Sequence, residues 1–209
     1  HGINRTSEKG WYTAMSMKVL LLIGSPKDNG STSTALGEYL LECLAPGGII
    51  AEQVNVRNLY RSEIGRRNVL DKIATADLII LSTPLYIDSP PAIIIRLLED
   101  WAERYTEKPP TKKQHLLAIS NCGFPESFHN DSAMIVYRTF ADEIGLIWSG
   151  GLAMGGGGAI NGRPLARSYM ARHAREALKI AGTALLNRDP VPQEAIELMA
   201  KPAISPRLY

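Results

Sequence analysis

The chain has 209 residues, 45% of them hydrophobic, which is enough for the core of one α/β domain and excludes a disordered chain. A formal net charge of +2 provides no strong field for nucleic acid. The two cysteines, Cys43 and Cys122, have no disulfide-framework or metal-ligand spacing, so we expect a reducing cytoplasm and no bound metal.

The N-terminal segment, residues 1–16, is polar and lacks the apolar core of a signal peptide. Because Met15 and Met17 stand just before the first apolar run, we expect this segment to be a leader or poorly ordered. No later apolar run approaches the ~20 residues of a membrane helix, so no membrane partner is expected.

From residue 17 onward, apolar runs of strand length alternate with segments of helical period. The first run is continuous, as in strands that are buried on both faces of a sheet. A hydroxyl-rich loop separates it from a helix with one apolar stripe. The predicted elements of this half are a strand at 18–24, a helix at 34–44, a strand at 50–56, a loop at 57–65 and a short helix at 68–75.

The second half continues the alternation. Pro91 suits the first turn of a helix, Asn130 or Asp131 is positioned to cap another, and Gly145 to end it. The predicted elements are strands at 77–83, 114–120 and 144–154, helices at 91–105, 131–144 and 164–186, and loops at 85–91 and 121–130. We expect one domain over 17–187 and a proline-rich tail over 188–209 with one helical turn at 195–199.

Five strands alternating with helices predict a parallel sheet covered on both faces. Ligands of such sheets bind beyond the carboxyl ends of the strands, where the strand order reverses. In the order 2-1-3-4-5, the first, third and fourth strands are neighbours. The loops that follow them are rich in Gly, Pro, Ser, Thr and Asn, so we expect these loops to form one site.

The loop after the first strand has the composition of a phosphate site. Its hydroxyls and one lysine precede a helix N-terminus, which attracts anions. Neither GxGxxG nor GxxxxGK[ST] occurs, which favours a monophosphate ester such as that of FMN over a dinucleotide or a nucleoside triphosphate. The alternative is an ordinary Ser/Thr-rich turn with an N-cap. The candidate residues are Ser25, Lys27, Ser31, Thr32 and Ser33.

The loop after the third strand has a backbone restricted by prolines, which lowers the ordering cost of binding a ligand. Leu85, Tyr86 and Ile87 offer apolar surface for a flat ring, although Tyr86 taken alone fits a core aromatic better. In the loop after the fourth strand, Gly123 permits close backbone approach and Phe124 offers a ring border.

Other reactive side chains give no recognisable site. Cys122 carries no mark of a lowered pKa, so burial is the better interpretation. Glu126, His129 and Asp131 match no metal spacing and fit a surface loop with a helix cap. No nucleophile–base grouping or GxSxG elbow occurs, so no catalytic side chain is predicted. This is consistent with chemistry carried by a redox cofactor.

Two motifs carry a family resemblance. Gly24-Ser25-Pro26-Lys27 with the hydroxyls at 31–33, together with the run 76–86 that ends in Thr83-Pro84-Leu85-Tyr86, resembles the NADPH-dependent FMN reductase family of flavodoxin-like proteins. The resemblance covers about residues 18–186. The family's usual Ser-Asn-Thr is Ser-Thr-Ser here, which leaves open which hydroxyl caps the helix. The cysteine motif of relatives with an iron–sulfur cluster is absent, and we expect no cluster.

The resemblance implies a flavodoxin-like three-layer sandwich that binds FMN. The first loop would hold the phosphate of FMN, Pro84, Leu85, Tyr86 and Ile87 would border the isoalloxazine ring, and Asn121, Gly123 and Phe124 would close its other side. It also implies a homodimer or homotetramer with the flavin near a subunit interface.

The predicted function is hydride transfer from NADPH or NADH through FMN to a small-molecule acceptor such as a quinone or a flavin. Two alternatives remain, a flavodoxin-type electron carrier and a flavin-free interaction module. Carriers of the flavodoxin type are usually strongly acidic, so the net charge of +2 and the pI of about 8.5 of this chain argue against the first.

Overall fold

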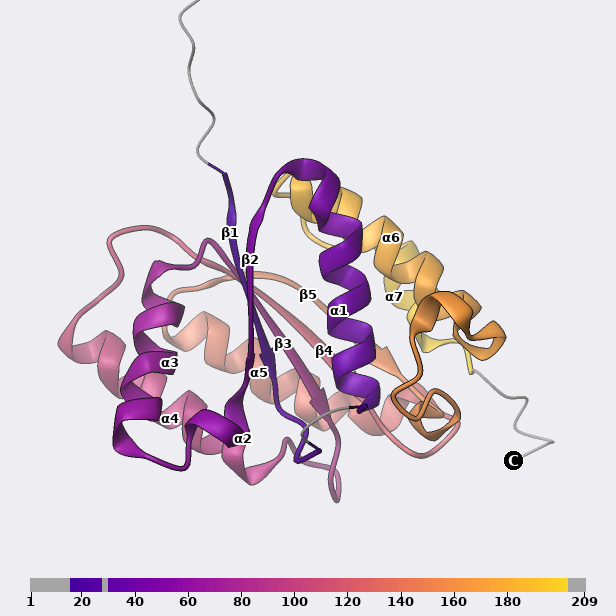
Figure 1. Cartoon of the computed structure of the whole chain (residues 1–209), viewed down its shortest axis with the longest axis horizontal. Helices are drawn as coiled ribbons and strands as arrows, with labels where there is room; N and C mark the ends of the chain where they lie inside the picture. Colours follow the sequence, from indigo (N-terminus) through magenta and orange to yellow (C-terminus); the bar gives the residue numbers. More distant parts are fainter. Residues whose placement is uncertain (1–15, 28–29, 203–209) are drawn as a thin grey trace, which may run out of the picture.

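A computed structural model describes residues 16–27 and 30–202 and forms three layers (Figure 1). Its centre is a five-stranded parallel sheet of order β2-β1-β3-β4-β5, which confirms the predicted class and strand order. The strands are β1 Lys18–Ile23, β2 Ile50–Asn55, β3 Leu78–Pro84, β4 His115–Asn121 and β5 Ile147–Met154.

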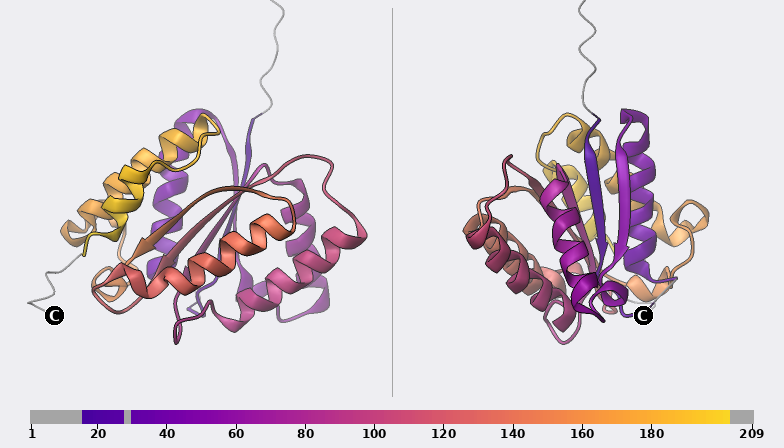
Figure 2. Two further views of the ribbon diagram at one scale, coloured as in Figure 1. Left: turned by 180° about the vertical axis from the view of Figure 1, so that it is seen from behind. Right: turned by 60° about the vertical axis from the view of Figure 1, so that its left-hand side comes forward.

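Helices cover both faces of the sheet. On one face lie α1 Thr32–Leu44, α6 Arg172–Leu186 and α7 Gln193–Ala200 (Figures 1 and 2). On the other lie α2 Val56–Leu59, α3 Glu63–Thr75, α4 Ala92–Glu107 and α5 Asp131–Glu143. Successive side chains of β1 alternate between the two cores, with Leu21 in the α1–α6 core and Leu22 in the α3–α5 core. This explains why the strand is a continuous apolar run.

Several predicted boundaries were wrong. The short helix predicted at 68–75 starts at Glu63, because the Ser62 hydroxyl caps it by accepting a hydrogen bond from Gly65 N at 3.1 Å. The predicted loop 57–65 also contains most of α2. The fifth strand starts at Ile147 instead of residue 144, because Gly145 ends α5 with a φ of 76°.

The C-terminal part differs in two ways. The long helix starts at Arg172 instead of residue 164, after two short 3₁₀ turns at Leu165–Arg167 and Tyr169–Ala171. The single turn predicted at 195–199 is the two-turn helix α7. It buries Ala195 and Met199 beside α6 and β5, so this helix adds to the core of the α1–α6 face.

Candidate functional site

The hydroxyl-rich loop after β1 leads into the buried N-terminus of α1. The helix starts at Thr32, two residues earlier than predicted, and Ser31 is its N-cap, with Oγ accepting a hydrogen bond from Thr34 N at 3.0 Å. This settles which hydroxyl caps the helix. Four hydroxyl side chains here are at most 9% exposed: Ser25, Ser31, Thr32 and Ser33.

Hydrogen bonds connect this region to the loops of other strands. Asn121 Nδ2, at the end of β4, donates to Ser33 Oγ at 2.8 Å and to the Thr83 carbonyl at 3.0 Å. Ser82 Oγ donates to the Ser33 carbonyl at 2.8 Å. The carboxyl ends of β3 and β4 and the first turn of α1 therefore meet around one buried amide, as the strand order predicts.

The loop after β3 forms a tight hairpin. Tyr86 N donates to Ser89 O at 3.0 Å and Ser89 N donates to Tyr86 O at 3.2 Å. Ile87 and Asp88 have φ values of 50° and 56°, positions that Asn-Gly usually fills in such turns. Ile87 is 99% exposed, so a β-branched side chain occupies strained backbone without packing against a described residue.

The candidate ring-border residues of this hairpin differ in exposure. Tyr86 is 47% exposed, which rules out the alternative that it is a core aromatic. Leu85 packs partly against the α3–α5 core, and Pro84 is the last residue of β3. Ser132 Oγ of α5 donates to the Asp88 carbonyl at 2.5 Å and holds the hairpin tip.

The loop after β4 contains a buried and an exposed half. Asn121 and Cys122 are buried, and burial raises the pKa of the Cys122 thiol, as expected for an unreactive cysteine. Gly123 and Phe124 are exposed. The Phe124 ring lies 4.4 Å from that of His129, which stacks on Phe128 at 4.5 Å.

The remaining polar candidates do not form a metal site. No group of three His, Cys, Asp or Glu side chains within residues 16–27 and 30–202 is arranged to hold a metal ion. Asn130 occupies the N-cap position of α5, but its side chain turns inward, accepting from Ser120 Oγ at 2.8 Å and donating to Met154 O at 3.2 Å. Asn130 is therefore the N-cap residue, one of the two predicted positions, but its side chain makes no capping hydrogen bond. The helices of the described part include none with the length and apolar character needed to cross a bilayer.

A fourth loop, the glycine-rich loop after β5, also contacts the site and was not predicted from the sequence. Gly157 accepts a 2.7 Å hydrogen bond from Thr32 Oγ1 and donates its N–H to Cys122 O at 2.8 Å. A Cβ on Gly162 would lie 1.7 Å from Gly30 O, so the two loops touch backbone to backbone. The glycines at 155–158 and 162 were the available signal, because close approach requires residues without a side chain.

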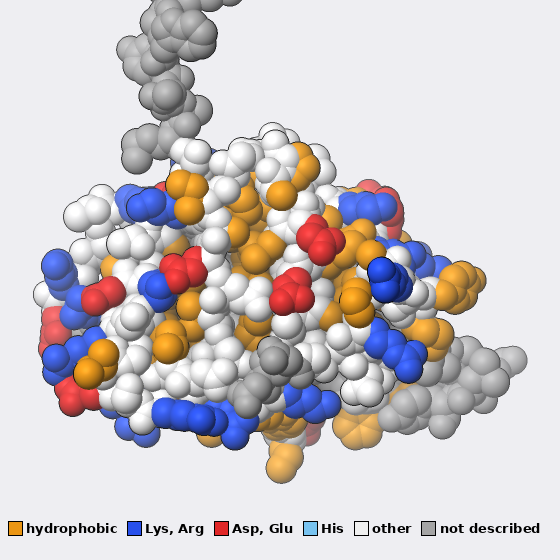
Figure 3. All heavy atoms as spheres, viewed as in Figure 1, with side chains coloured by type: hydrophobic (Ala, Val, Ile, Leu, Met, Phe, Trp, Pro, Cys, Tyr) orange, Lys and Arg blue, Asp and Glu red, His pale blue; other side chains and the backbone are white. Residues whose placement is uncertain are grey.

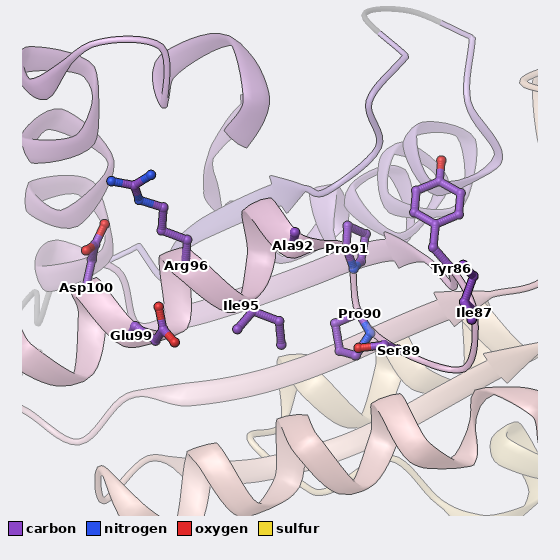
Figure 4. Close-up of a pocket in the computed structure, with 10 residues that line it drawn as sticks. All are labelled: Tyr86, Ile87, Ser89, Pro90, Pro91, Ala92, Ile95, Arg96, Glu99 and Asp100. Carbon is purple, nitrogen blue, oxygen red and sulfur yellow. The ribbon is translucent and has the colours of Figure 1, made fainter.

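An open groove lies beside this site, along the first turns of α4. It has a volume of about 950 Å³ and extends from Tyr86 and Ile87 past Pro91 and Arg96 to Asp100 (Figure 4). In Figure 3, basic side chains gather at the lower edge, over α2 and the neighbouring β1–α1 loop. The site thus combines an apolar hairpin with a positively charged edge.

This fold and site define a flavodoxin-like α/β protein whose loops meet beyond the carboxyl ends of β1, β3 and β4. The model of the NADPH-dependent FMN reductase family matches residues 17–131, and the chain belongs to that family. The resemblance noted in the sequence is thereby confirmed. The family supports FMN as the cofactor and an oxidoreductase activity in general.

Solved structures share the fold. The apo form of the NADH:FMN oxidoreductase EMOB has a TM-score of 0.65 and 19% identity over 92% of this chain and 99% of that one. An FMN-dependent NADH-azoreductase from Bacillus anthracis, in complex with FMN, has a TM-score of 0.58 and 14% identity over 82% of this chain and 100% of that one. A flavodoxin from the domain Archaea has a TM-score of 0.55 and 11% identity over 82% of this chain and 98% of that one. A comparison with curated protein sequences gave no match.

The residues at the start of α1 fit the phosphate ester of FMN. The first turn of the helix contains no acidic side chain, and the Ser31 cap satisfies only one of the N–H groups that lack partners within the helix. The buried hydroxyls of Ser25, Ser31 and Ser33 add donors, and exposed Lys27 adds a positive charge. Thr32 can contribute only its backbone N–H, because its hydroxyl already donates to the Gly157 carbonyl. A phosphate dianion is the kind of ligand that such a helix N-terminus stabilises.

Proposed function

We propose that this chain is an FMN-dependent oxidoreductase that oxidises NADPH or NADH and reduces a small-molecule acceptor, such as a quinone or a free flavin. The observation that carries the proposal is the convergence at Asn121. Its side chain joins the first turn of α1 to the ends of β3 and β4, so that the hydroxyl-rich loop and the apolar hairpin belong to one site.

The proposed binding mode divides the site in two. The phosphate of FMN lies against Ser25, Lys27, Ser31, Thr32 and Ser33. The ring system lies between two groups of residues, the first being Pro84, Leu85, Tyr86 and Ile87 and the second Asn121, Gly123 and Phe124. The exposed parts of Tyr86, Ile87 and Phe124 support this division, because they offer apolar surface beside the buried polar part.

When bound, FMN would supply the hydride- and electron-transfer chemistry. The chain's own residues bind and orient the cofactor, and the buried α1 N-terminus excludes water from the phosphate. No side chain of the site is required as an acid or base. This agrees with Cys122, because burial raises the pKa of its thiol. We also propose a cytoplasmic homodimer or homotetramer.

The test begins with FMN binding. The purified protein should bind added FMN, with quenching of flavin fluorescence, and should then oxidise NADPH or NADH in the presence of a quinone. Lys27→Glu should weaken FMN binding about tenfold through charge repulsion, whereas Lys108→Glu, an exposed charge reversal at the end of α4, should leave it unchanged. Protein that binds no FMN would exclude the proposal.

An electron carrier is the second candidate, favoured only by the shared fold of the archaeal flavodoxin. A protein that binds FMN but oxidises neither nicotinamide cofactor with any acceptor would support this candidate. The net charge of +2 argues against it, because carriers of this fold are usually strongly acidic.

A further inference from the structure

Two polar side chains hold the β1–α1 loop from the side of β2. Asn55, the last residue of β2, donates from Nδ2 to the Lys27 carbonyl at 3.3 Å. Arg57, in α2, donates from Nη1 to the Pro26 carbonyl. Neither residue belongs to the predicted site, and both contact the backbone of the loop that contains Ser25 and Lys27.

The position of β2 determines what these contacts do. In the sheet, β1 lies between β2 and β3, so Asn55 and Arg57 contact the loop from the side of β2, whereas the loops after β3 and β4 follow strands on the other side of β1. The C=O and N–H of a trans peptide point in opposite directions. The Pro26 carbonyl and the Lys27 N–H belong to one peptide, and this N–H donates to Ser25 Oγ at 3.2 Å. When Arg57 fixes the Pro26 carbonyl, it therefore also fixes the Ser25 hydroxyl.

The helix that carries Arg57 has its own anchor. It has only four residues, too few for stability without tertiary contacts. Its C-cap residue, Tyr60, donates from its hydroxyl to Asp100 Oδ2 at 2.9 Å, and Asp100 also binds Arg66 through two hydrogen bonds of 3.0 and 2.7 Å. Arg57 thus extends from a segment fastened to α4.

Asn55 lowers the stability of the fold, which a purely structural role would not explain. Its Oδ1 atom is buried and has no hydrogen-bond partner in the described part of the chain. A buried acceptor without a partner lowers stability, so such groups call for a compensating role. The contact of Nδ2 with the Lys27 carbonyl provides one.

We propose that Asn55 and Arg57 are positioning residues that hold the Ser25–Lys27 part of the β1–α1 loop in its phosphate-binding conformation before the cofactor arrives. This inference rests on the proposed function and adds a support for the phosphate loop from outside the three converging loops. The recognised group is a phosphate monoester, and preorganisation increases affinity by lowering the ordering cost of binding.

The experiment compares FMN with riboflavin, which has the same ring and no phosphate. In Asn55→Ala and Arg57→Ala, the dissociation constant of FMN should rise about five- to tenfold, the equivalent of one lost hydrogen bond. That of riboflavin should change less than about twofold, because riboflavin makes no phosphate contact. Arg57→Lys keeps a charged donor and should restore most of the FMN affinity.

Gln53→Ala is the matched control. Gln53 lies on the same strand and donates from Nε2 to Glu38 Oε1 at 3.1 Å, a hydrogen bond of similar type that does not reach the loop. Its FMN affinity should remain at the wild-type value. Equal losses of FMN and riboflavin affinity, or no loss of either in both loop variants, would overturn the inference.

Hydrogen–deuterium exchange of the cofactor-free protein provides a second measurement. The amides of Gly24, Ser25, Lys27 and residues 30–33 should exchange several-fold faster in Asn55→Ala and Arg57→Ala than in Gln53→Ala, and unchanged exchange would contradict the positioning role. If the wild-type protein fails to bind FMN, the proposed function fails, and exchange still tests the positioning on its own. Arg57 is exposed, so its variants test the idea even if Asn55→Ala does not fold.

Discussion

The two halves of the candidate site are built differently. At the start of α1, four hydroxyl side chains are at most 9% exposed: Ser25, Ser31, Thr32 and Ser33. They form hydrogen bonds with the end of β4, with the loop after β5, or within their own loop and the first turn of α1. At the Tyr86–Ser89 hairpin, two large apolar side chains stand in solvent, and Ile87 occupies a left-handed backbone conformation.

This difference indicates different roles in binding. The α1 side is preformed, so it contributes affinity and orientation at a low ordering cost. The hairpin side keeps exposed apolar surface, which a ring system or another partner would cover. It also keeps backbone strain at Ile87. Changes on the α1 side should therefore lower both stability and affinity, whereas changes in the hairpin should separate the two.

The largest effect is expected at the junction of the halves. Asn121→Ala removes two buried hydrogen bonds and leaves the Thr83 carbonyl and Ser33 Oγ without their donor. The free energy of unfolding should fall by about 2–3 kcal/mol, measured by urea denaturation, and FMN affinity should fall with it. Asn68→Ala, at an exposed position of α3, should change stability by no more than about 0.5 kcal/mol. Similar stabilities of the two variants would show that Asn121 does not connect the halves.

A smaller loss is expected where α1 meets the loop after β5. Thr32→Val keeps the side-chain shape but removes the hydrogen bond from Oγ1 to the Gly157 carbonyl. We expect a loss of about 1–2 kcal/mol in the free energy of unfolding, because a buried carbonyl loses its partner. Thr106→Val, which removes an exposed bond to Ala102 O in α4, is the matched control. A wild-type denaturation midpoint for Thr32→Val would contradict the preformed α1 side.

The hairpin should respond in the opposite direction. Ile87→Gly relieves the strain of a β-branched residue at a φ of 50° and should stabilise the cofactor-free protein by about 0.5–1 kcal/mol, after the entropy cost of glycine. FMN affinity should fall, because the exposed side chain no longer covers the ring. Calorimetry and fluorescence titration measure the two effects. Unchanged FMN affinity would exclude Ile87 from the ring border.

The smallest effect lies outside both halves, at the amino end of β4. Burial and the nearby Arg188 lower the pKa of His115, although Asp77 opposes this, and Nδ1 forms a 2.9 Å hydrogen bond with Ser149 Oγ. Below about pH 6.5 the unfolded chain binds more protons than the folded one, so stability falls as the pH falls towards the lowered pKa. His115→Gln should flatten this slope in urea denaturation and leave FMN affinity unchanged. An identical slope in the variant would show that His115 does not cause it.

The sheet order was predictable because strand burial and loop composition follow simple rules. Continuous apolar runs identified β1 and β3, which contribute to both cores, and the parallel order brings their loops together. Boundaries were less predictable where one side-chain hydrogen bond decides them. Ser62 extends α3 by a full turn beyond its apolar pattern in this way.

The contact of the loop after β5 with the site was not predictable from local sequence. A glycine run indicates conformational freedom, but it does not tell which backbone comes close. The contact between Gly162 and Gly30 depends on the tertiary placement of two distant loops. The support from Asn55 and Arg57 was not predictable for the same reason, because the local sequence does not tell which loop these side chains contact.

The contact between Gly30 and Gly162 also has a consequence for the order of events during synthesis. The first loop of the site emerges from the ribosome early, but the backbone against which it rests follows the last strand of the sheet. A nascent chain that ends before residue 162 lacks that surface. Cofactor loading should therefore await the synthesis of β5 and its loop, and C-terminally truncated chains that stop short of this point should not retain the flavin.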